Sequence, residues 1–554
     1  MQIRGVMLDR SAFPQSVIDA YGKAGSWPQR DIYAFLDEAA ARHPDKTLIV
    51  DRFGRLTYAE VLAQTNAIAG NLVGLGIGRG DRVAVQLPNW RYFPLMEYAL
   101  ARLGAVIVPL PPIYRQRELR LMLSLAEPVM AICPDSFRGF DHAGMFHELQ
   151  AEIPSLRLLA VIGAARPDGA MDFSDLLRPN ETPLPPALDP NIVSEIAFTS
   201  GTTGEPKGVM HTANTNFCPL LNLIEDQKLG ADTVVLMAST FGHQTGFAYG
   251  GQLPIIVGGS VVLMERWDAR DGAALIDREN VTWMMGATPF LQDLTDAVEA
   301  GAGHCRSLRI FLCSGAPIPR PLLIKAQQVL GAHVVSGWGM TEVGLTTLSR
   351  LEDAPEKIFG SDGRPLRGMQ IRVVDADDRP LPDGEEGELQ CRGPTLFAGY
   401  WRRPDVTAAS FADGRNAGDG GWLRTGDRAR RDADGYIRIT GRSKDIIVRG
   451  GENIPIVEVE DLLHKHPRVQ VAAIVAIPDP RLQERACAVI VTRDGGGFDM
   501  PQMLAFLERE RLAKQYFPEH LVVMDALPMT PSGKVQKYIL RKKVLEIIGV
   551  SDVA

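Results

Sequence analysis

The 554-residue chain has few cysteines, and they are widely spaced. No pair of cysteines has the spacing of a metal-binding or redox motif. The chain also lacks an HExxH motif, and His464 and His466, two residues apart, do not share a helix face. These absences argue against a structural zinc site and a disulfide framework, and they favour reduced thiols in a cytoplasmic protein. The cysteines are Cys133, Cys218, Cys305, Cys313, Cys391 and Cys487.

Long apolar runs and an excess of positive charge are also missing. No apolar stretch reaches the length of a transmembrane helix, and the segment after Met1 leads into no signal-peptide core. The net charge is −8, with 59 Lys and Arg against 67 Asp and Glu, so no basic field for a nucleic-acid backbone is expected. Residues 551–554 match no retention or peroxisomal signal. We therefore expect no nucleic-acid partner, no integral membrane segment and a cytoplasmic location.

The first part of the chain alternates helical and strand patterns. Residues 58–75 and 92–103 space their apolar side chains as amphipathic helices do, whereas residues 82–87 and 105–110 are short apolar runs. Alternation of this kind predicts parallel α/β units. At 45% hydrophobic and 23% charged residues the composition is that of a globular protein, and its length predicts more than one domain.

The pattern changes twice further along the chain. Short strands separated by Asp, Gly and Pro turns predict a β-rich subdomain at about residues 360–440. Beyond it, strands alternate with a helix at 503–512 and with another that has Pro455 as its first residue. We therefore expect an N-terminal α/β domain over residues 1–440 and a C-terminal α+β domain over residues 441–554.

The most informative segment is a loop that contains three glycines, four hydroxyl side chains and one lysine within ten residues. Glycines allow tight turns, and successive backbone N–H groups in such a loop form an anion site. The loop is not a Walker A motif, because Pro206 precedes Lys207 and Gly208 follows it. It predicts a polyphosphate-binding loop of another type. The residues are Thr199, Ser200, Gly201, Thr202, Thr203, Gly204, Glu205, Pro206, Lys207 and Gly208.

Four further motifs carry groups suited to a nucleotide. Residues 336–342 end in Thr341 and Glu342, and a carboxylate is a good Mg²⁺ ligand. Asp427 can accept hydrogen bonds from two vicinal hydroxyls, as a ribose presents them. Taken singly, the last three of the five motifs are most often plain turns or solvated charges, whereas the glycine-rich loop is not, and all five in this order favour one function. The remaining motifs are residues 441–445, followed by 450–453, and residues 531–534.

Together the motifs resemble the adenylate-forming superfamily of acyl-CoA synthetases, peptide-synthetase adenylation domains and firefly luciferase. The resemblance runs from about Tyr33 to Leu545. It implies a large N-terminal α/β domain with a β-barrel subdomain, and a small mobile C-terminal α+β domain joined by a hinge near residues 442–445. It also implies ATP, Mg²⁺ and coenzyme A as cofactors or co-substrates.

The resemblance implies that the glycine-rich loop holds the β- and γ-phosphates of ATP. Trp338 would stack on the adenine, where most relatives have Tyr. Thr341 would contact the α-phosphate, Glu342 would bind Mg²⁺, and Asp427 would hold the ribose with help from Arg442. The implied ATP-binding residues are Thr199, Ser200, Gly201, Thr202, Thr203, Gly204, Lys207, Gly315, Ala316, Pro317, Trp338, Gly339, Met340, Asp427 and Arg442.

The implied reaction has two steps. A carboxylate attacks the α-phosphorus to give an acyl-adenylate and pyrophosphate, with Lys534 bridging the two reactants. The C-terminal domain would then turn about a hinge at Lys444 and bring Gly450 and Gly451 to the site, where the thiol of coenzyme A attacks.

His243 is the residue that best narrows the choice of acid. By resemblance it stands where amino-acid-activating domains have an Asp that pairs with the substrate ammonium, a charge that His cannot supply. The alternative is a hydrogen-bonded core histidine. We expect a neutral hydrophobic acid that is short- or medium-chain, alicyclic (as in cyclohexanecarboxylate-CoA ligases) or aromatic. The implied acyl pocket comprises Phe247, Met285, Gly286 and Gly337.

The acceptor and the natural acid stay open at this point. Only 20 residues follow Lys534, so we expect the acceptor, free coenzyme A, to arrive from outside the chain. The alternatives are a stand-alone acyl-AMP ligase that loads a separate carrier protein, a luciferase-like oxygenase and a non-catalytic homologue. The last is disfavoured because the charged residues of all five motifs are present. The oligomeric state also stays open.

Overall fold

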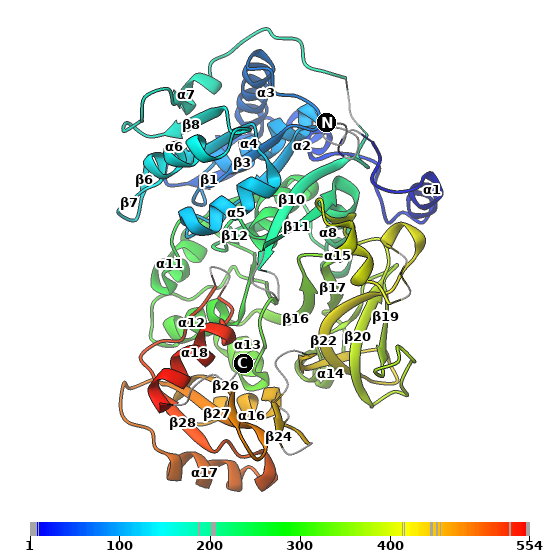
Figure 1. Ribbon diagram of the computed structural model, residues 1–554. Coiled ribbons are helices and arrows are strands. Elements are labelled where there is room, and N and C mark those ends of the chain that lie inside the picture. Colours follow the sequence, from blue (N-terminus) through cyan, green and yellow to red (C-terminus); the bar gives the residue numbers. More distant parts are fainter. Residues whose placement is uncertain are drawn as a thin grey trace.

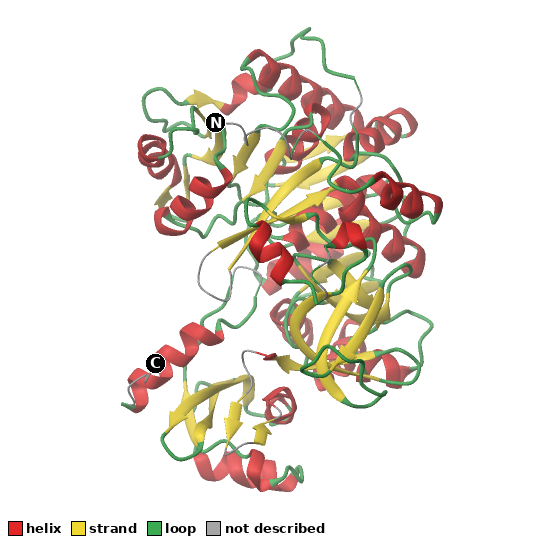
Figure 2. Ribbon diagram, turned by 45° about the vertical axis from the view of Figure 1, so that its right-hand side comes forward, coloured by secondary structure: helices red, strands yellow, loops and turns green. Residues whose placement is uncertain are grey.

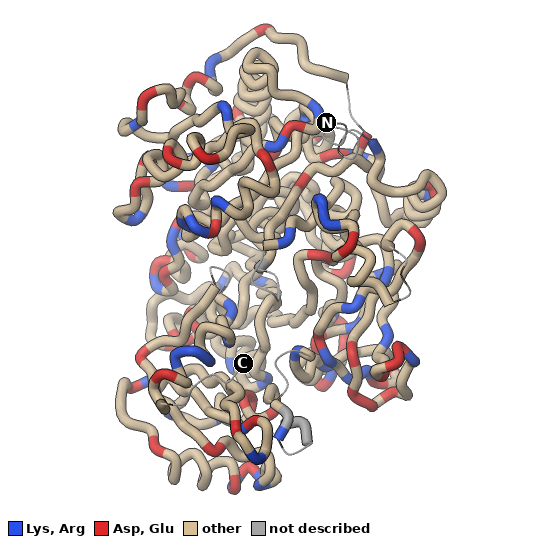
Figure 3. Tube along the Cα trace, viewed as in Figure 1, with Lys and Arg blue, Asp and Glu red and all other residues tan. Residues whose placement is uncertain are grey.

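The computed structural model describes residues 8, 10–186, 189–200, 206–412, 414, 416–443, 447–449, 452–454, 456–530 and 533–549. Two large sheets and a small antiparallel sheet precede a C-terminal α+β unit at one end of the molecule (Figures 1 and 2). Lys and Arg are interspersed with Asp and Glu along the chain (Figure 3). Among the residues described, no helix is long and apolar enough to cross a membrane.

A nine-stranded sheet forms the centre of the molecule. Six adjacent strands, from β16 to β1 in spatial order, run parallel, and antiparallel strands extend both edges. The parallel strands are mostly buried, which is why they read as continuous apolar runs instead of alternating ones. The spatial order is β18 (Arg364–Pro365), β17 (Gly344–Leu348), β16 (His333–Met340), β15 (Ile310–Cys313), β14 (Trp283–Gly286), β12 (Val234–Met237), β13 (Ser260–Leu263), β1 (Thr47–Asp51) and β2 (Gly54–Thr57).

A second sheet of eight strands carries the glycine-rich loop. Its parallel strands confirm the α/β units predicted from the sequence, and an antiparallel hairpin of β10 and β11 lies near one edge. The spatial order is β21 (Gly399–Tyr400), β11 (Pro206–Thr212), β10 (Val193–Ser200), β4 (Val106–Pro109), β3 (Arg82–Val85), β5 (Met130–Pro134), β8 (Leu158–Ile162) and β9 (Met171–Asp172). A separate small hairpin joins β6 (Ser136–Phe137) and β7 (Phe140–Asp141).

Helices of the N-terminal part begin and end where local chemistry allows. The helix predicted over residues 58–75 is α3 (Tyr58–Gly74), which Thr57 and Glu60 cap reciprocally. The helix predicted over residues 92–103 is α4 (Tyr92–Leu103), which ends at a left-handed Gly104. The others are α1 (Gln15–Lys23), α2 (Ile32–Arg42), α5 (Gln116–Ala126), α6 (His142–Glu152), α7 (Phe173–Leu176), α8 (Ala213–Gln227), α9 (Gln244–Gly246), the π-helix η1 (Phe247–Gln252), α10 (Leu253–Val257), α11 (Ala269–Glu279), α12 (Thr288–Glu299), α13 (Arg320–Leu330), α14 (Pro355–Gly360), α15 (Pro404–Ala409) and the 3-10 turn η2 (Ala417–Asp419).

The β-rich segment expected from the sequence contains a four-stranded antiparallel sheet. Its order is β19 (Gln370–Val374), β20 (Glu386–Arg392), β22 (Leu423–Arg431) and β23 (Ile437–Arg442). Within β22, Gly426 has φ +72°, a left-handed conformation that a glycine adopts without strain. This turn in the strand directly precedes Asp427.

The C-terminal unit has a five-stranded sheet covered by helices. The helix predicted over residues 503–512 is displaced, since α17 spans Met500–Arg509: Asp499 and Gln502 form a capping box that starts it earlier. Pro455 lies outside the described residues. The elements are β24 (Ile447–Arg449), β25 (Glu452–Ile454), α16 (Ile456–His464), β26 (Val469–Asp479), β27 (Gln483–Thr492), α17, the 3-10 turn η4 (Lys514–Tyr516), β28 (His520–Val523) and α18 (Lys537–Ile548).

Ion pairs join the C-terminal unit to the preceding part of the chain. Arg493 contacts Asp296 of α12 at 3.2 Å, and Asp461 of α16 pairs with Arg438 of β23. Helices α16 and α13 are also in contact, and Figure 1 shows the C-terminal elements beside α12 and α13. This orientation brings residue 534 toward the edge of the nine-stranded sheet.

Two glycines with the same backbone conformation test how closely the sheets are packed. Gly363 and Gly384 both have φ +88°, but a Cβ at Gly363 would lie 2.2 Å from the carbonyl carbon of Leu348, whereas one at Gly384 meets nothing within 4 Å. We expect Gly384→Ala to lower the free energy of unfolding by about 1–2 kcal/mol from backbone strain. Gly363→Ala should cost at least about 2 kcal/mol more because of overpacking. Urea denaturation measures both, and equal losses would contradict the close approach.

Candidate active site

The carboxyl ends of neighbouring parallel strands gather most of the predicted site residues. Gly286, Cys313 and Ser336 lie in one row across β14, β15 and β16. The chain leaves the sheet after Gly286 and after Cys313, whereas β16 continues from Ser336 to Met340 beside β17. This is the edge of the sheet where α/β proteins commonly bind ligands. In this way the sheet brings together the predicted adenine segment, the predicted stacking residue and part of the predicted acyl pocket. The residues concerned are Met285, Gly286, Gly315, Ala316, Pro317, Gly337, Trp338, Gly339 and Met340.

The predicted phosphate loop connects β10 to β11. Thr199 pairs with Lys207 across the hairpin, and Ser200 pairs with Pro206. The ammonium of Lys207 lies 5.1 Å from the ring centre of Tyr400, a cation–π contact that holds the lysine near the loop. Residues 201–205 lie outside the described part of the chain, so Gly201, Thr202, Thr203 and Gly204 stay predictions, as does any contact of the Ser200 side chain.

Glu342 is a buried carboxylate with a phenol partner. The hydroxyl of Tyr400 donates to Glu342 Oε1 at 2.8 Å, and both residues are 6% exposed. Burial raises the pKa of Glu342, against the opposing effects of the Tyr400 bond, Arg442 and Lys207. Tyr400 thus contacts both the predicted metal ligand and the predicted phosphate-binding lysine. The sequence analysis missed it, because the strand pairing of β21 with β11 brings it there and no local motif marks it.

Glu342 has the chemistry of a Mg²⁺ ligand. The described residues contain no group of three or more His, Cys, Asp or Glu side chains placed to hold a metal ion. Mg²⁺ is commonly held by one or two carboxylates together with substrate phosphates and water. Glu342, whose partner Tyr400 also contacts Lys207, fits that mode.

His211 is a second residue that the sequence analysis missed. Its Nε2 donates to the carbonyl oxygen of Thr341 at 2.7 Å, and its Nδ1 lies 3.0 Å from Thr215 Oγ1. The ring is 1% exposed, and burial lowers the pKa of His211 to about 4, opposed by the bond to Thr341. A neutral imidazole therefore fixes the backbone at the residue before Glu342.

Asp427 joins two sheets through its two carboxylate oxygens. Oδ2 accepts a hydrogen bond from Nε1 of Trp338 at 2.8 Å, and Oδ1 pairs with Nε of Arg442 at 2.9 Å. Asp427 and Arg442 are direct partners across β22 and β23, whereas Trp338 belongs to the nine-stranded sheet. Asp427 thus contacts two other residues that are predicted to contact the nucleoside.

Lys534 and His243 belong to opposite parts of the chain, and the charge of Lys534 acts on the imidazole. The charge of Lys534 and, more strongly, burial lower the pKa of His243 to about 4. The backbone N–H of Lys534 donates to Thr530 Oγ1 at 2.9 Å, and a Cβ at the preceding Gly533 would lie 3.2 Å from Pro289 Cγ. The turn that bears Lys534 therefore lies against the start of α12. His243 Nδ1 accepts from the N–H of Thr245 at 3.3 Å, so the imidazole caps α9.

Close packing explains why two positions of the predicted acyl pocket are glycine. A Cβ at Gly286 would lie 2.9 Å from Phe290 Cβ, and one at Gly337 would lie 2.7 Å from Leu345 Cδ1. Met285 is 5% exposed. Packing alone therefore accounts for the missing side chains, and the assignment of these residues to the acyl pocket stays a prediction.

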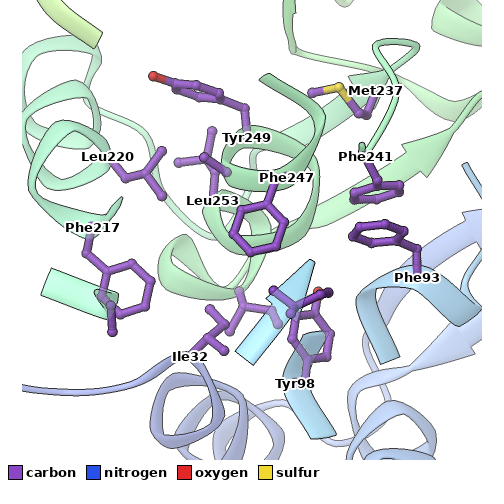
Figure 4. Packing of buried hydrophobic residues seen from close by; sticks show 14 of the residues in the cluster. Ile32, Phe93, Tyr98, Phe217, Leu220, Met237, Phe241, Phe247, Tyr249 and Leu253 are labelled. Atoms are coloured by element: carbon purple, nitrogen blue, oxygen red, sulfur yellow. The ribbon is translucent and has the colours of Figure 1, made fainter. Parts of the chain in front are cut away.

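Phe247 lies in a densely packed aromatic region. Figure 4 shows its ring facing Phe93 and Ile32, and the centres of the Phe247 and Phe93 rings are 6.5 Å apart. Phe247 also lines a cavity of about 40 Å³ together with Glu97 and Gln252. Glu97 Oε1 accepts from Gln252 Nε2 at 2.9 Å, and burial raises the pKa of Glu97 well above its usual range. Glu97 stands out in the sequence as the one acidic residue of the otherwise mostly apolar helix α4, and this marks the polar pair with Gln252.

Three residues predicted to act in the second half-reaction lie outside the described part of the chain. They are Lys444 at the predicted hinge and Gly450 and Gly451 on the predicted coenzyme A side.

The bond between Tyr400 and Glu342 should contribute to stability. Tyr400→Phe keeps the ring near Lys207 but leaves Glu342 Oε1 without its donor, and an unsatisfied buried group costs about 1–3 kcal/mol. Urea denaturation without ligands measures the loss. Tyr538→Phe, at a residue that is 70% exposed, is the matched control. Equal stability of the two variants would mean that the bond contributes nothing.

The buried His211 should make stability depend on pH. With a folded pKa of about 4 against an ordinary 6.5, the unfolded chain binds the proton first, so stability is full above pH 6.5 and falls as the pH drops toward 4. At pH 5 the wild type should have lost about 2 kcal/mol more than His211→Asn, relative to pH 7.5. Denaturant unfolding at both pH values tests this, with the exposed His147→Asn as control. Parallel losses in wild type and His211→Asn would refute it.

Comparison with known proteins places the chain in a family. The sequence matches the family described as AMP-binding enzyme over residues 36–401, and the AMP-binding enzyme C-terminal domain over residues 458–534. It is 36% identical to a protein of Escherichia coli (strain K12) named medium-chain fatty-acid–CoA ligase, over 95% of this chain and 92% of that protein. It is 34% identical to a Streptomyces protein named salicylyl-CoA synthase / salicylate adenylyltransferase, over 96% of this chain and 97% of that protein.

A solved structure has the same architecture. The crystal structure of ATP-bound MatB from Rhodopseudomonas palustris superposes with a TM-score of 0.83 at 28% identity, over 94% of this chain and 99% of that one. The family matches, the identity to full-length relatives and the shared fold agree with the five motifs. The chain belongs to the AMP-binding, or adenylate-forming, enzyme family.

Proposed function

We propose that this enzyme joins a neutral hydrophobic carboxylic acid to coenzyme A, using ATP and passing through an acyl-adenylate. The observation that carries the proposal is the grouping of the residues suited to ATP: Asp427 contacts Trp338 and Arg442, and Tyr400 contacts both Glu342 and Lys207. The charge of Lys534 acts on His243 of the same region. A cation from the C-terminal unit thereby joins the N-terminal groups suited to ATP. The relative named medium-chain fatty-acid–CoA ligase supports the same chemistry.

In the first step an oxygen of the acid forms a bond to the α-phosphorus, and pyrophosphate leaves with the electrons of the broken P–O bond. Lys534 would hold the acid carboxylate against the α-phosphate, while Lys207 and the loop of residues 199–204 hold the β- and γ-phosphates. Thr341, fixed by His211, would donate to the α-phosphate. Mg²⁺, held by Glu342 and phosphate oxygens, would neutralise charge that develops on the triphosphate.

The nucleoside would lie at the end of β16. Trp338 offers an aromatic face to the adenine, whose edge residues 315–317, Gly339 and Met340 would line. The buried Asp427 would accept from the ribose hydroxyls, and Arg442 adds a positive charge beside it.

In the second step the thiol sulfur of coenzyme A forms a bond to the acyl carbonyl carbon, and AMP leaves. The C-terminal unit would turn about Lys444, which withdraws Lys534 and brings Gly450 and Gly451 to the site. The turn would break the pairs Arg493–Asp296 and Asp461–Arg438. His243 would line the thiol channel as a neutral imidazole.

The walls of the acyl pocket favour an uncharged tail. Phe247 and Met285 are apolar, Gly286 and Gly337 carry no side chain, and His243 is neutral at pH 7. An amino acid would bring an ammonium that these groups leave unpaired, which is costly away from water. A short- or medium-chain, alicyclic or aromatic acid meets no such cost.

A second candidate is an acyl-AMP ligase that passes its product to a carrier protein. It is favoured by the relative whose name includes salicylate adenylyltransferase. In either case a cytoplasmic location is part of the proposal, supported by six buried cysteines that are all free thiols.

Pyrophosphate release separates the two candidates. The enzyme is given ATP, Mg²⁺ and one acid from a panel of short, medium and long fatty acids, cyclohexanecarboxylate, benzoate, cinnamate and amino acids, each with and without coenzyme A. We expect steady turnover that needs both a neutral hydrophobic acid and coenzyme A. A single stoichiometric burst indifferent to coenzyme A would instead support the carrier-protein candidate, and silence across the panel would refute both.

Lys534→Ala separates the two half-reactions. We expect acid-dependent pyrophosphate release to fall by at least about 100-fold, because the cation that bridges the reactants is lost. Thioester formation from supplied acyl-adenylate should stay within about tenfold of wild type, since Lys534 has left the site by then. The exposed Lys543→Ala is the matched control. Equal loss of both steps would overturn the proposal that the C-terminal unit turns and withdraws Lys534 before the second step.

A further inference from the structure

The hydrogen bond from Trp338 to Asp427 has a role separate from stacking on the adenine. It joins a residue of the nine-stranded sheet to one of the β-rich sheet, with Trp338 8% and Asp427 5% exposed. An indole N–H only donates, and neither Phe nor Tyr offers a donor at that point of the ring. A tryptophan at this position therefore supplies something that its aromatic face does not.

The two donors define the orientation of the carboxylate. The torsion that turns an aspartate carboxylate has a broad, roughly two-fold profile, so it is poorly fixed by itself. In this structure Trp338 donates to Oδ2, and the guanidinium of Arg442 forms an ion pair with Oδ1 at 2.9 Å, so each oxygen has its own partner. Thr425 fixes the backbone as well, because its Oγ1 accepts from the N–H of Asp427 at 3.1 Å.

A count of lone pairs shows what the fixed carboxylate can still accept. An ionised carboxylate offers about four acceptor positions. The N–H of Trp338 takes one position on Oδ2, and Arg442 is paired with Oδ1, which leaves at least one position on each oxygen for a ligand. A pair of vicinal hydroxyls, one bond to each oxygen, matches that remainder.

We propose that Trp338 is a positioning residue whose N–H holds Asp427 so that the carboxylate accepts from both ribose hydroxyls at once. The enzyme's preference for ribonucleotides over deoxyribonucleotides then depends on this single N–H. The inference rests on the proposed function, in which Asp427 binds the ribose of ATP. It predicts two separable effects of Trp338, one from the ring and one from the N–H.

Binding of AMP and its deoxy analogues separates the two effects without any chemical step. Loss of stacking weakens the binding of AMP, 2′-deoxyAMP and 3′-deoxyAMP alike. Loss of Asp427 positioning weakens the binding of AMP more than that of the two deoxy analogues. Dissociation constants for the three nucleotides are measured by calorimetry for wild type, Trp338→Phe and Asp427→Asn. Trp422→Phe, in the same β-rich region but stacked between Arg372 and Arg392, is the matched control.

We expect wild type to prefer AMP over either deoxy analogue by about tenfold or more, the value of a hydrogen bond to a charged group. Trp338→Phe should reduce that preference at least about fivefold, with little change in the dissociation constants of the deoxy analogues. Trp422→Phe should keep the wild-type preference. Replacement of Trp338 by benzothienylalanine keeps the size of the ring and exchanges the N–H for sulfur. It should behave as Trp338→Phe does, which would exclude repacking of a smaller ring as the cause.

Two outcomes overturn the inference, and they differ from failure of the proposed function. If Trp338→Phe weakens all three nucleotides by the same factor, or none of them, the N–H does not position Asp427. If Asp427→Asn also keeps the wild-type preference, or wild type shows none, Asp427 does not bind the ribose and the proposed nucleotide site itself is wrong.

Discussion

Two buried carboxylates, Glu342 and Asp427, tie the candidate active site together. A carboxylate removed from water must be hydrogen-bonded or paired, and each of these finds its partner on a different sheet. Glu342 accepts from Tyr400 of the eight-stranded sheet, and Asp427 accepts from Trp338 of the nine-stranded sheet. The cost of leaving either group unpaired therefore holds three sheets in one arrangement. The same oxygens are the ones suited to Mg²⁺ and ribose, so the groups that fix the fold are also those that would meet the nucleotide.

The strand that completes the Asp427 site also leads to the C-terminal unit. Within β23, Arg438 pairs with Asp461 of that unit, and Arg442 pairs with Asp427. Burial raises the pKa of Asp461 to about 7, so protonation of Asp461 near neutral pH would weaken its pair with Arg438. If the Arg438–Asp461 pair breaks and the Arg442–Asp427 pair holds, the C-terminal unit would turn without disturbing the ribose site. The predicted hinge follows Arg442 directly.

Sequence patterns predicted those parts of the molecule that depend on neighbours along the chain. Apolar spacing with a glycine stop gave the bounds of α4, and a tight cluster of glycines and hydroxyls marked the loop before Lys207. The pattern failed where a cap overrode it, as Asp499 does at the start of α17. Tyr400 and His211 were invisible because their roles arise from strand pairing and from contact with Thr341, 130 residues away. Individual residue roles came from resemblance, since no local pattern says which carboxylate meets a ribose.

The choice of acid depends on a different balance from the choice of nucleotide. Nucleotide recognition would use charged groups whose partners are fixed, so a wrong ligand leaves a buried charge unpaired and is rejected strongly. The predicted acyl pocket offers apolar walls, and an extra or missing methylene in such a pocket changes binding only by about 1–3 kcal/mol. A side chain at Gly286 or Gly337 would clash with its neighbours, and Phe247 packs edge-on against Phe93. The shape of the acid's tail would therefore rank the acids by affinity, whereas a charge on the tail would exclude an acid.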